Sequence, residues 1–434
     1  MRLIRTQGPG ARQAAALLQS LEQRGAASLS SVEPAVRRIL RDVRTRGDRA
    51  LLRYAAQFDG LADQSQLHIT PQEMSAAWEA TPQTMRDSLS TAAEQIRAFA
   101  VNQLPASWSE SPIPGLMTGQ LVRPLSAVGC YVPSGRHPLP STLLMTAIPA
   151  QVAGVGRIVV VSPKPAPETL AAAHLLGIAE FYRVGGAHAI AALAYGTQSI
   201  ARVDKIAGPG NLYVTAAKRL VAFDCAIDML AGPTEIVVTS ESGNPADIAA
   251  DLVAQAEHDP ETLAVFITTQ LALAKDVIAE ARLQSRGNPI AAQSLKRNGV
   301  AIVAASLDEA RGITNRLAPE HLTVDSPRDL EWVQNAGSVF IGRWSPQPMG
   351  DYISGPNHTL PTGGLARVRG GLSVNDFVKL ITVQQYNKSA LQILGPKAAL
   401  LADAEGLSGH AAAIRSRLRN PARLAPAGKG RRNA

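Results

Sequence analysis

The chain has 434 residues, 46% of them hydrophobic, so it exceeds the roughly 250–300 residues at which a single core stops growing, and we expect a globular protein of two or more domains. No apolar run approaches the roughly 18 residues of a membrane span, and the N-terminus lacks the apolar core of a signal peptide, which predicts a cytoplasmic protein with no membrane partner. The only cysteines, Cys130 and Cys225, exclude a disulfide framework and a cysteine-rich zinc site, so a bound metal must use nitrogen and oxygen ligands.

The net charge of +8 is concentrated at the C-terminus. Residues 411–434 carry seven cations and no acid, which leaves the other 410 residues at about +1. Aromatic residues make up only 4% of the chain, and no basic stretch is interleaved with them, so the sequence does not indicate a nucleic-acid partner. We interpret the basic tail as a frayed, solvated terminus.

The order of predicted elements indicates an α/β protein. The first 100 residues predict amphipathic helices, at 11–25 and 31–58. From about residue 127, short β-branched runs alternate with helical stretches, which predicts parallel sheets covered by helices on both faces. After residue 371 we expect further helices, at 375–386, 389–402 and 409–418. The predicted strands are 128–132, 157–161, 181–184, 235–239, 263–268, 300–303, 321–324 and 338–341.

Four loops at predicted strand ends are rich in glycine and proline: 131–135, 185–188, 208–211 and 231–235. In such sheets these loops often carry function, and glycine lets backbone N–H groups approach a phosphate. None of them matches the G-x-G-x-x-G fingerprint, however, and tight turns need glycine for steric reasons alone. A dinucleotide site and ordinary turns therefore both remain open.

Half of the eight histidines lie beside a carboxylate, an amide or a glycine: His258, His321, His358 and His410. Imidazole binds metals and changes charge near neutral pH, so histidines with these neighbouring residues indicate an enzyme. Gln255 precedes His258 by three positions on a predicted helix, so both could bind one ion from one helical face, although a solvated polar face is the alternative. Asp351 shares with His358 a long loop dense in glycine and proline, and long loops in compact domains are often functional.

Glu320 and His321 lie where a predicted helix gives way to a predicted strand. A neighbouring carboxylate and imidazole suit two proton transfers, one from an alcohol and one from a water, although an exposed pair without a role is equally consistent. His410, five residues after Glu405, is on its own typical of a surface histidine. His68 and His174 have no such company, and we interpret both as structural.

Seven ordered motifs together resemble the histidinol dehydrogenase family, nearly from end to end of the chain. They are Gly129-Cys-Tyr-Val-Pro133, Val203-Asp-Lys-Ile-Ala-Gly-Pro-Gly-Asn211, Ala231-Gly-Pro-Thr-Glu235, Gln255-Ala-Glu-His258, Ala318-Pro-Glu-His-Leu322, Gly350-Asp351 with Ser354-Gly-Pro-Asn-His358, and Glu405-Gly-Leu-Ser-Gly-His410. The resemblance implies a zinc-dependent and NAD-dependent oxidation of L-histidinol through L-histidinal to L-histidine, the last two steps of histidine biosynthesis, with two NAD consumed.

The resemblance also implies a role for individual residues. His321 would take the hydroxyl proton as hydride leaves, and Glu320 would activate the water that attacks the aldehyde. The implied zinc ligands are Gln255, His258, Asp351 and His410. The implied substrate contacts are Thr234, Gln255, His258, His321, Asp351, His358, Glu405 and His410. The implied NAD contacts are Tyr131, His188 and Asn211.

The fold implied by the resemblance is two Rossmann-like parallel-sheet domains with small helical extensions. We expect a helical arm at 1–25, a domain built from 26–130 and 236–371 that carries the zinc and acid/base residues, and a second domain at 131–235 on the NAD side. Residues 372–434 would form a helical domain that completes the partner's site in a homodimer with shared active sites.

The chain departs from the family pattern at two places. His188 stands where glutamine is usual, and Arg136-His137 make one loop more basic than expected. A related zinc and NAD dehydrogenase of another polar alcohol, such as a sulfonated diol, is the main alternative, with Arg136 as the candidate cation. His358 and Glu405 suit a cationic amino alcohol and favour histidinol. A non-enzymatic protein that binds through its basic tail would instead predict salt-sensitive binding and no turnover.

Overall fold

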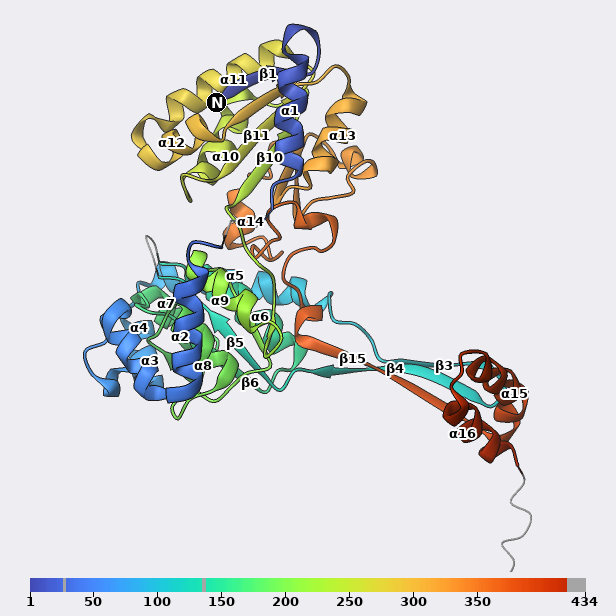
Figure 1. Cartoon of the computed structure of the whole chain (residues 1–434). Coiled ribbons are helices and arrows are strands. Elements are labelled where there is room, and N and C mark those ends of the chain that lie inside the picture. Colours follow the sequence, from blue (N-terminus) through green and yellow to red (C-terminus); the bar gives the residue numbers. More distant parts are fainter. Residues whose placement is uncertain (26–28, 135–137, 420–434) are drawn as a thin grey trace, which may run out of the picture. The chain divides into compact units, whose positions relative to one another are not determined.

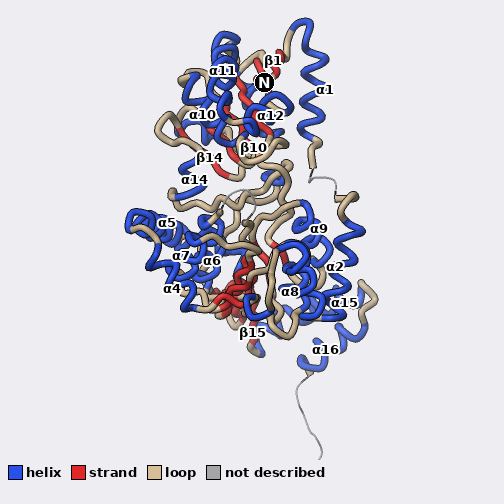
Figure 2. Tube along the Cα trace, turned by 90° about the vertical axis from the view of Figure 1, so that its left-hand side faces the viewer, coloured by secondary structure: helices blue, strands red, loops and turns tan. Residues whose placement is uncertain are grey.

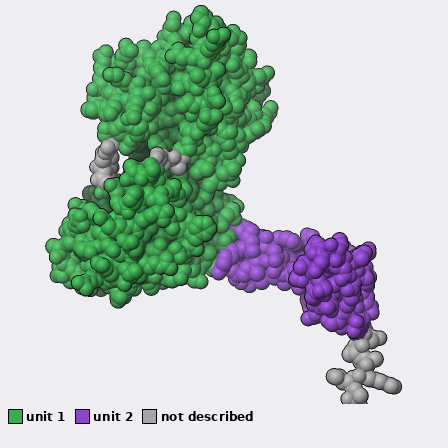
Figure 3. All heavy atoms as spheres, in the orientation of Figure 1, with its two compact units in different colours: residues 1–104, 124–378 green, residues 105–123, 379–434 purple. Residues whose placement is uncertain are grey.

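The computed structural model describes residues 1–25, 29–134 and 138–419. Arg136, His137 and the part of the basic tail beyond residue 419 lie outside these ranges. The chain divides into two compact units, 1–104 with 124–378 and 105–123 with 379–434 (Figure 3). None of the described helices is both long and apolar enough to cross a bilayer.

The first unit contains two six-stranded sheets (Figure 1). Sheet I has the order β1-β12-β11-β10-β13-β14, and each strand is parallel to its neighbours. From β10 onward this is the order of a Rossmann half, with the chain reversing direction across the sheet between β10 and β13. Its strands are β1 (Arg2–Arg5), β10 (Glu235–Thr239), β11 (Leu263–Thr268), β12 (Val300–Val303), β13 (His321–Val324) and β14 (Ser338–Ile341).

Sheet II has the order β2-β7-β6-β5-β8-β9, the same Rossmann half with the chain reversing between β5 and β8. Only the edge strand β2 is antiparallel to its neighbour. Its strands are β2 (His68–Ile69), β5 (Ala127–Tyr131), β6 (Arg157–Val161), β7 (Glu180–Tyr182), β8 (Lys205–Ala207) and β9 (Ala226–Ile227). The fold class is therefore as predicted, two parallel α/β sheets.

Both sheets are buried on both faces, which explains their continuous β-branched strands. In β10, Ile236, Val237 and Val238 are all nearly inaccessible, because successive side chains enter opposite cores. Sheet I is covered on one face by α1 (Ala11–Glu22) and α13 (Leu307–Leu317), and on the other by α10 (Pro245–Ala256), α11 (Leu271–Gln284) and α12 (Pro289–Arg297).

Sheet II lies in the same way between two helical layers (Figure 2). One layer contains α2 (Glu33–Arg46), α3 (Asp48–Tyr54), α8 (Gly186–Tyr195) and α9 (Leu212–Val221). The other contains α4 (Pro71–Ala80), α5 (Gln83–Val101), α6 (Pro140–Ala153) and α7 (Pro167–Leu175). Helices α2 to α5 thus cover sheet II, which corrects the expectation that 26–130 joins 236–371 in one domain. Amphipathic spacing shows that a helix has a buried face, but not which sheet that face covers.

The second unit contains a three-stranded sheet and two packed helices. Its strands, in the order β15-β4-β3, are β3 (Trp108–Ile113), β4 (Leu116–Pro124) and β15 (Val378–Tyr386). Helices α15 (Lys388–Ala404) and α16 (Ser408–Leu418) confirm the helices predicted at 389–402 and 409–418. The α-helix predicted at 375–386 is wrong, because most of this segment, residues 378–386, pairs as β15 with β4. Pairing with a distant strand outweighs local helical spacing.

Candidate active site

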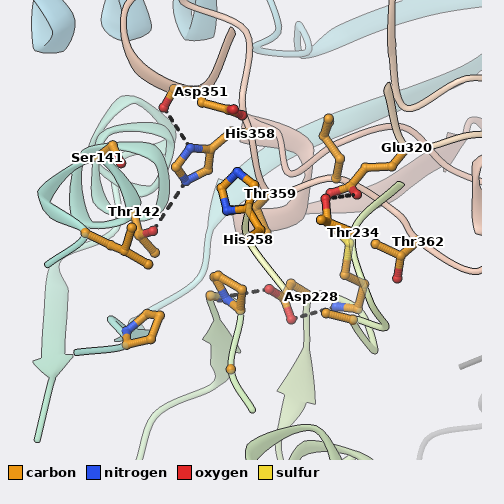
Figure 4. A pocket seen from close by; sticks show the side chains of 18 of the residues that line it. Ser141, Thr142, Asp228, Thr234, His258, Glu320, Asp351, His358, Thr359 and Thr362 are labelled. Atoms are coloured by element: carbon orange, nitrogen blue, oxygen red, sulfur yellow. Dashed lines mark hydrogen bonds between the residues drawn. The ribbon is translucent and has the colours of Figure 1, made fainter. Parts of the chain in front are cut away.

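A cavity of about 370 Å³ lies in the first unit, where loops from both sheets meet (Figure 4). Pro133 and Gly208 line it from the carboxyl ends of β5 and β8, the point at which sheet II reverses its strand order. Thr234 and His321 line it from the amino ends of β10 and β13. Sheet I also reverses its strand order between these two strands, but here the opposite ends of the strands face the cavity. The cavity thus occupies the position outside the carboxyl ends of sheet II at which open α/β sheets bind ligands.

The cavity brings together seven of the predicted site residues, namely Thr234, Gln255, His258, Glu320, His321, Asp351 and His358. Two local predictions were wrong. His258 lies beyond the end of α10, in a turn in which its N–H donates to the Gln255 carbonyl at 3.3 Å, so the two do not share a helical face. Asp351 lies on a short helix, α14 (Pro348–Tyr352), rather than in an irregular loop.

Glu320 is a buried carboxylate with two hydrogen-bond donors. Its Oε2 accepts from the Thr234 hydroxyl at 2.5 Å and from the backbone N–H of Glu235 at 2.8 Å. Burial raises the pKa of Glu320 to about 7, although the neighbouring His321 and these hydrogen bonds oppose the rise. A carboxyl group with this pKa can release and regain a proton near neutral pH, as a general base requires.

His321 has one ring nitrogen fixed and one free. Its Nδ1 lies 3.0 Å from the Glu235 carbonyl oxygen, so the neutral ring carries its hydrogen on Nδ1 and its lone pair on Nε2. Nε2 is buried, makes no hydrogen bond, and lies 3.7 Å from Asp351 Oδ1. Burial lowers the pKa of His321, but Glu320 and Asp351 outweigh burial and the pKa is raised. The free nitrogen can therefore accept a proton and the ring can hold it.

The backbone before this pair is strained. Ala318 ends α13 with φ 45°, and it is the only non-glycine residue at positive φ within the described ranges. For an alanine this conformation costs about 1–2 kcal/mol. Gly337 packs against the Glu320 carbonyl so closely that a Cβ would lie 2.6 Å from its oxygen. Such strain is concentrated at functional sites, and here it lies directly before the acid/base pair.

Gln255, His258 and Asp351 offer oxygen and nitrogen donors to the same cavity. The Gln255 side chain is 1% exposed, and its Nε2 donates to the Thr234 hydroxyl while its Oε1 has no partner. Burial raises the pKa of Asp351, but the interaction with the nearby His321 ring outweighs burial and lowers the pKa, so the carboxylate is ionised. An orphaned amide oxygen beside a carboxylate and an imidazole fits a bound cation.

Within the described ranges no three His, Cys, Asp or Glu side chains form a metal-binding group. The candidate donors above include only two residues of these kinds, so a metal here would need a further ligand. His410 lies on α16, and Glu405 at the end of α15, both exposed and both in the second unit.

His358 is held as a neutral imidazole. Its Nδ1 lies 2.8 Å from the Asp351 carbonyl oxygen, and its Nε2 lies 3.4 Å from the Thr142 hydroxyl (Figure 4). Burial lowers the pKa of His358. The ring can therefore donate to the backbone through Nδ1 and accept a hydrogen bond from a ligand through Nε2.

The three predicted NAD contacts are not among the described residues that line the cavity. Tyr131 ends β5, and its OH accepts from the backbone N–H of Gly186 at 3.1 Å, while Asn211 caps α9. His188 lies in the first turn of α8. His188 is 1% exposed, and its Nε2 lies 2.7 Å from Asp59 Oδ2. Direct contact with NAD stays a prediction for all three.

A buried ion pair, Lys218 with Asp228, also lines the cavity and was not predicted from the sequence. The pair binds both polar groups of Gly208, since Asp228 Oδ2 accepts its N–H at 2.8 Å and Lys218 Nζ donates to its carbonyl at 2.9 Å. Gly208 has φ 114°, and a Cβ there would collide with the Tyr131 carbonyl oxygen. The sequence did contain one indication that Lys218 is buried, because this lysine lies in the apolar i, i+3, i+4, i+7 stripe of α9.

The fold and the cavity define a Rossmann-like α/β protein with a buried acid/base pair that lines the cavity outside the carboxyl ends of sheet II. The sequence profile of histidinol dehydrogenase matches residues 22–418. A histidinol dehydrogenase of Geobacter metallireducens is 44% identical over 410 residues, which cover 91% of this chain and 94% of that protein. One of Geobacillus kaustophilus is 48% identical over 396 residues, which cover 88% and 93%.

The crystal structure of histidinol dehydrogenase from Elizabethkingia anophelis superposes with a TM-score of 0.90 at 34% identity, covering 96% of this chain and 98% of that one. The chain therefore belongs to the histidinol dehydrogenase family, and the protein is a dehydrogenase.

Proposed function

We propose that the protein oxidises L-histidinol through L-histidinal to L-histidine, with zinc and NAD as cofactors. The observation that carries the proposal is the buried pair of Glu320 and His321, which opens onto the same cavity as Gln255, His258 and Asp351. Membership of the histidinol dehydrogenase family supports this choice of substrate.

Zinc would be held by Gln255, His258, Asp351 and His410, a set of nitrogen and oxygen donors that zinc accepts. The unpartnered Oε1 of Gln255 and the ionised carboxylate of Asp351 support this assignment. When bound, zinc would supply a Lewis acid that fixes the nitrogen donors of the substrate. The chain's own residues would then perform the proton transfers.

In the first oxidation the alcohol loses a hydride from carbon to the nicotinamide of NAD and a proton from oxygen to His321 Nε2. The fixed hydrogen on Nδ1 leaves Nε2 as the basic nitrogen, and Asp351 at 3.7 Å stabilises the imidazolium that forms. His358, neutral and held by the Asp351 backbone, would orient the substrate from the other side of the cavity.

In the second oxidation a water adds to the aldehyde while the ionised Glu320 accepts one of its protons. The hydrate then loses a hydride to a second NAD and a further proton, which leaves the carboxylate of histidine. Because the pKa of Glu320 is about 7, this step should slow below that pH, where the carboxyl group is protonated.

We propose that Glu405 and His410 reach this site from a second copy of the chain, as substrate contact and metal ligand. Exposed leucine and isoleucine side chains on α15 support a partner surface on the second unit, since Ile393, Leu400 and Leu401 are 53%, 68% and 67% exposed. The NAD would lie along the sheet II loops near Tyr131, His188 and Asn211, at the carboxyl ends of the strands.

A sulfonated substrate is less well supported. Lys218 is the only lysine or arginine among the described residues that line the cavity, and Asp228 already neutralises it. Among the described lining residues a sulfonate would therefore find no free cation, and Arg136 lies outside the described ranges.

The direct test is NADH formation from histidinol by the purified protein, followed by its absorbance. Chelating the metal should abolish turnover, and added zinc should restore it. Full activity of the metal-free protein would refute the metal assignment, and no turnover of histidinol by the zinc-loaded protein would refute the substrate.

A further inference from the structure

One residue anchors both members of the acid/base pair through its backbone. The N–H of Glu235 donates to Glu320 Oε2 at 2.8 Å, and its carbonyl oxygen accepts from His321 Nδ1 at 3.0 Å. The first hydrogen bond orients the carboxylate, and the second fixes the tautomer that leaves His321 Nε2 basic. The placement of both groups therefore depends on how firmly the peptide groups of Glu235 are held.

The side chain of Glu235 is held by a bidentate ion pair with Arg24. Arg24 Nε and Nη2 donate to the two carboxylate oxygens at 2.6 Å each, and the Gly363 N–H adds a third bond at 3.0 Å. Only 14% of the Arg24 side chain and 4% of the Glu235 side chain are exposed. A buried fork of this kind is among the strongest and most directional of protein hydrogen-bonded pairs.

Arg24 is itself fixed by the ends of two helices. Its Nη1 donates to the Leu21 carbonyl at 2.7 Å, and its Nη2 donates to the Leu317 carbonyl, also at 2.7 Å. Leu21 is in the last turn of α1 and Leu317 ends α13, immediately before the strained Ala318. Arg24 thus joins the end of the N-terminal helix, the segment leading to Glu320, and the first residue of β10.

We propose that Arg24 is a positioning residue for the reaction, which acts through the carboxylate of Glu235 to hold Glu320 and His321 in place and to balance the charge beside Glu320. The inference rests on the acid/base function proposed above for that pair. A bidentate ion pair is rarely needed for stability alone, because well-packed apolar side chains often stabilise a buried position equally well.

The ion pair of Arg24 and Glu235 also has an electrostatic effect on the pKa of Glu320. Burial is the main reason that the pKa of Glu320 is raised; His321 on its own segment opposes the rise, and the Glu235 carboxylate on β10 adds to it. Asp351 on α14 faces the opposite side of the His321 ring. Because the Arg24 guanidinium neutralises Glu235, its loss should raise the pKa of Glu320 further, and loss of the Glu235 charge should lower it.

The test compares Arg24→Met, Glu235→Gln and the double variant with the wild-type holoenzyme, in the pH dependence of kcat for histidinal oxidation. Arg24→Met should move the acid limb to higher pH by about one unit, and Glu235→Gln should move it to lower pH by about as much. In the double variant the limb should return to the wild-type position. The plateau kcat should fall at least tenfold in all three, while the KM for histidinal changes less than threefold, because positioning of the pair is lost but substrate binding is not.

Arg316→Met is the matched control. Arg316 Nε donates to Glu22 Oε1 at 2.8 Å and so joins the same helix α1 to α13, but at the surface and away from Glu235. This variant should leave both the acid limb and the plateau kcat unchanged.

Several outcomes would overturn the inference. If both single variants fold but keep the wild-type acid limb, the ion pair of Arg24 and Glu235 has only a structural role. If Arg24→Met does not fold because Glu235 is left buried without its partner, the other two variants carry the test. An unmoved limb in Glu235→Gln, or a full plateau kcat in either Glu235→Gln or the double variant, then overturns the inference equally. A wild-type limb that persists in Glu320→Gln is a different result, which would refute the role proposed for Glu320 itself.

Discussion

The buried carboxyl group of Glu320 makes a prediction about stability as well as about catalysis. Its pKa is about 7 in the folded protein, against an ordinary value of 4.5. Between these pH values the folded state holds a proton that the unfolded state has released, so the contribution of Glu320 to stability is greatest below pH 4.5 and is lost as the pH rises through about 7. At about 1.4 kcal/mol for each pKa unit, ionising Glu320 in place costs about 3 kcal/mol.

Glu320→Gln removes the charge and keeps the shape. The glutamine oxygen can still accept from the Thr234 hydroxyl and the Glu235 N–H, as the protonated acid does. The free energy of unfolding of the variant should therefore exceed that of the wild type by up to about 3 kcal/mol near pH 8.5, and this difference should vanish as the pH falls below 4.5. The same variant should lose oxidation of histidinal, since it has no base to activate water.

The measurement is urea unfolding at fixed protein and zinc concentrations over this pH range. Glu94→Gln, at an exposed position of α5, is the control for removing a carboxylate. Parallel stability curves for wild type and Glu320→Gln would show that Glu320 is not held at a raised pKa, and the assignment of the base would then fail with it.

Three further predictions concern the metal, the assembly and the cofactor side. Gln255→Leu should weaken zinc binding at least tenfold in a chelator competition, with little change in melting temperature, whereas unchanged affinity would remove Gln255 from the ligand set. His258→Asn and His410→Asn chains, each inactive alone, should recover about a quarter of wild-type activity when refolded together, since about half of randomly paired dimers are mixed and each has one intact site. Heterodimers without activity would show that both ligands come from one chain. His188→Gln should give an NAD Michaelis constant with the same pH dependence as the wild type, because an amide can still donate to Asp59; diverging curves would show that the ring acts on the cofactor.

The sequence predicted the central strands well because they are buried on both faces. Five predicted strands of sheet I match the structure residue for residue, from β10 to β14, and each is a short apolar run bounded by turn residues. β15 could not be predicted in this way, because β4, its partner, lies more than 250 residues earlier in the chain. Its strand conformation depends on that pairing and not on local preference.

The candidate site was predicted from its motifs, but its geometry was not. Sequence spacing placed Gln255 and His258 on one helical face, whereas α10 ends between them. Both line the cavity, Gln255 from the helix and His258 from the turn that follows it. The contacts that orient the acid/base pair were invisible in the sequence, because Arg24 and Glu235 are 211 positions apart. Such contacts follow from the way in which α1 and α13 pack on sheet I.

The register of two neighbouring strands explains why Glu320 and His321 can act together. Ile236 on β10 pairs with His321 on β13, so Glu235, the first residue of β10, and Glu320, the residue just before β13, lie side by side at the amino edge of sheet I. At this edge the N–H of Glu235 is available to bind the Glu320 carboxylate. A shift of one residue in the pairing register of β13 with β10 would turn His321 to the opposite face of the sheet. It would break both hydrogen bonds that Glu235 makes to the acid/base pair. The acid/base geometry is therefore a property of the β-ladder and of the ion pair that secures its first residue, and changes in the ligand-binding loops should alter affinity before they alter the placement of this pair.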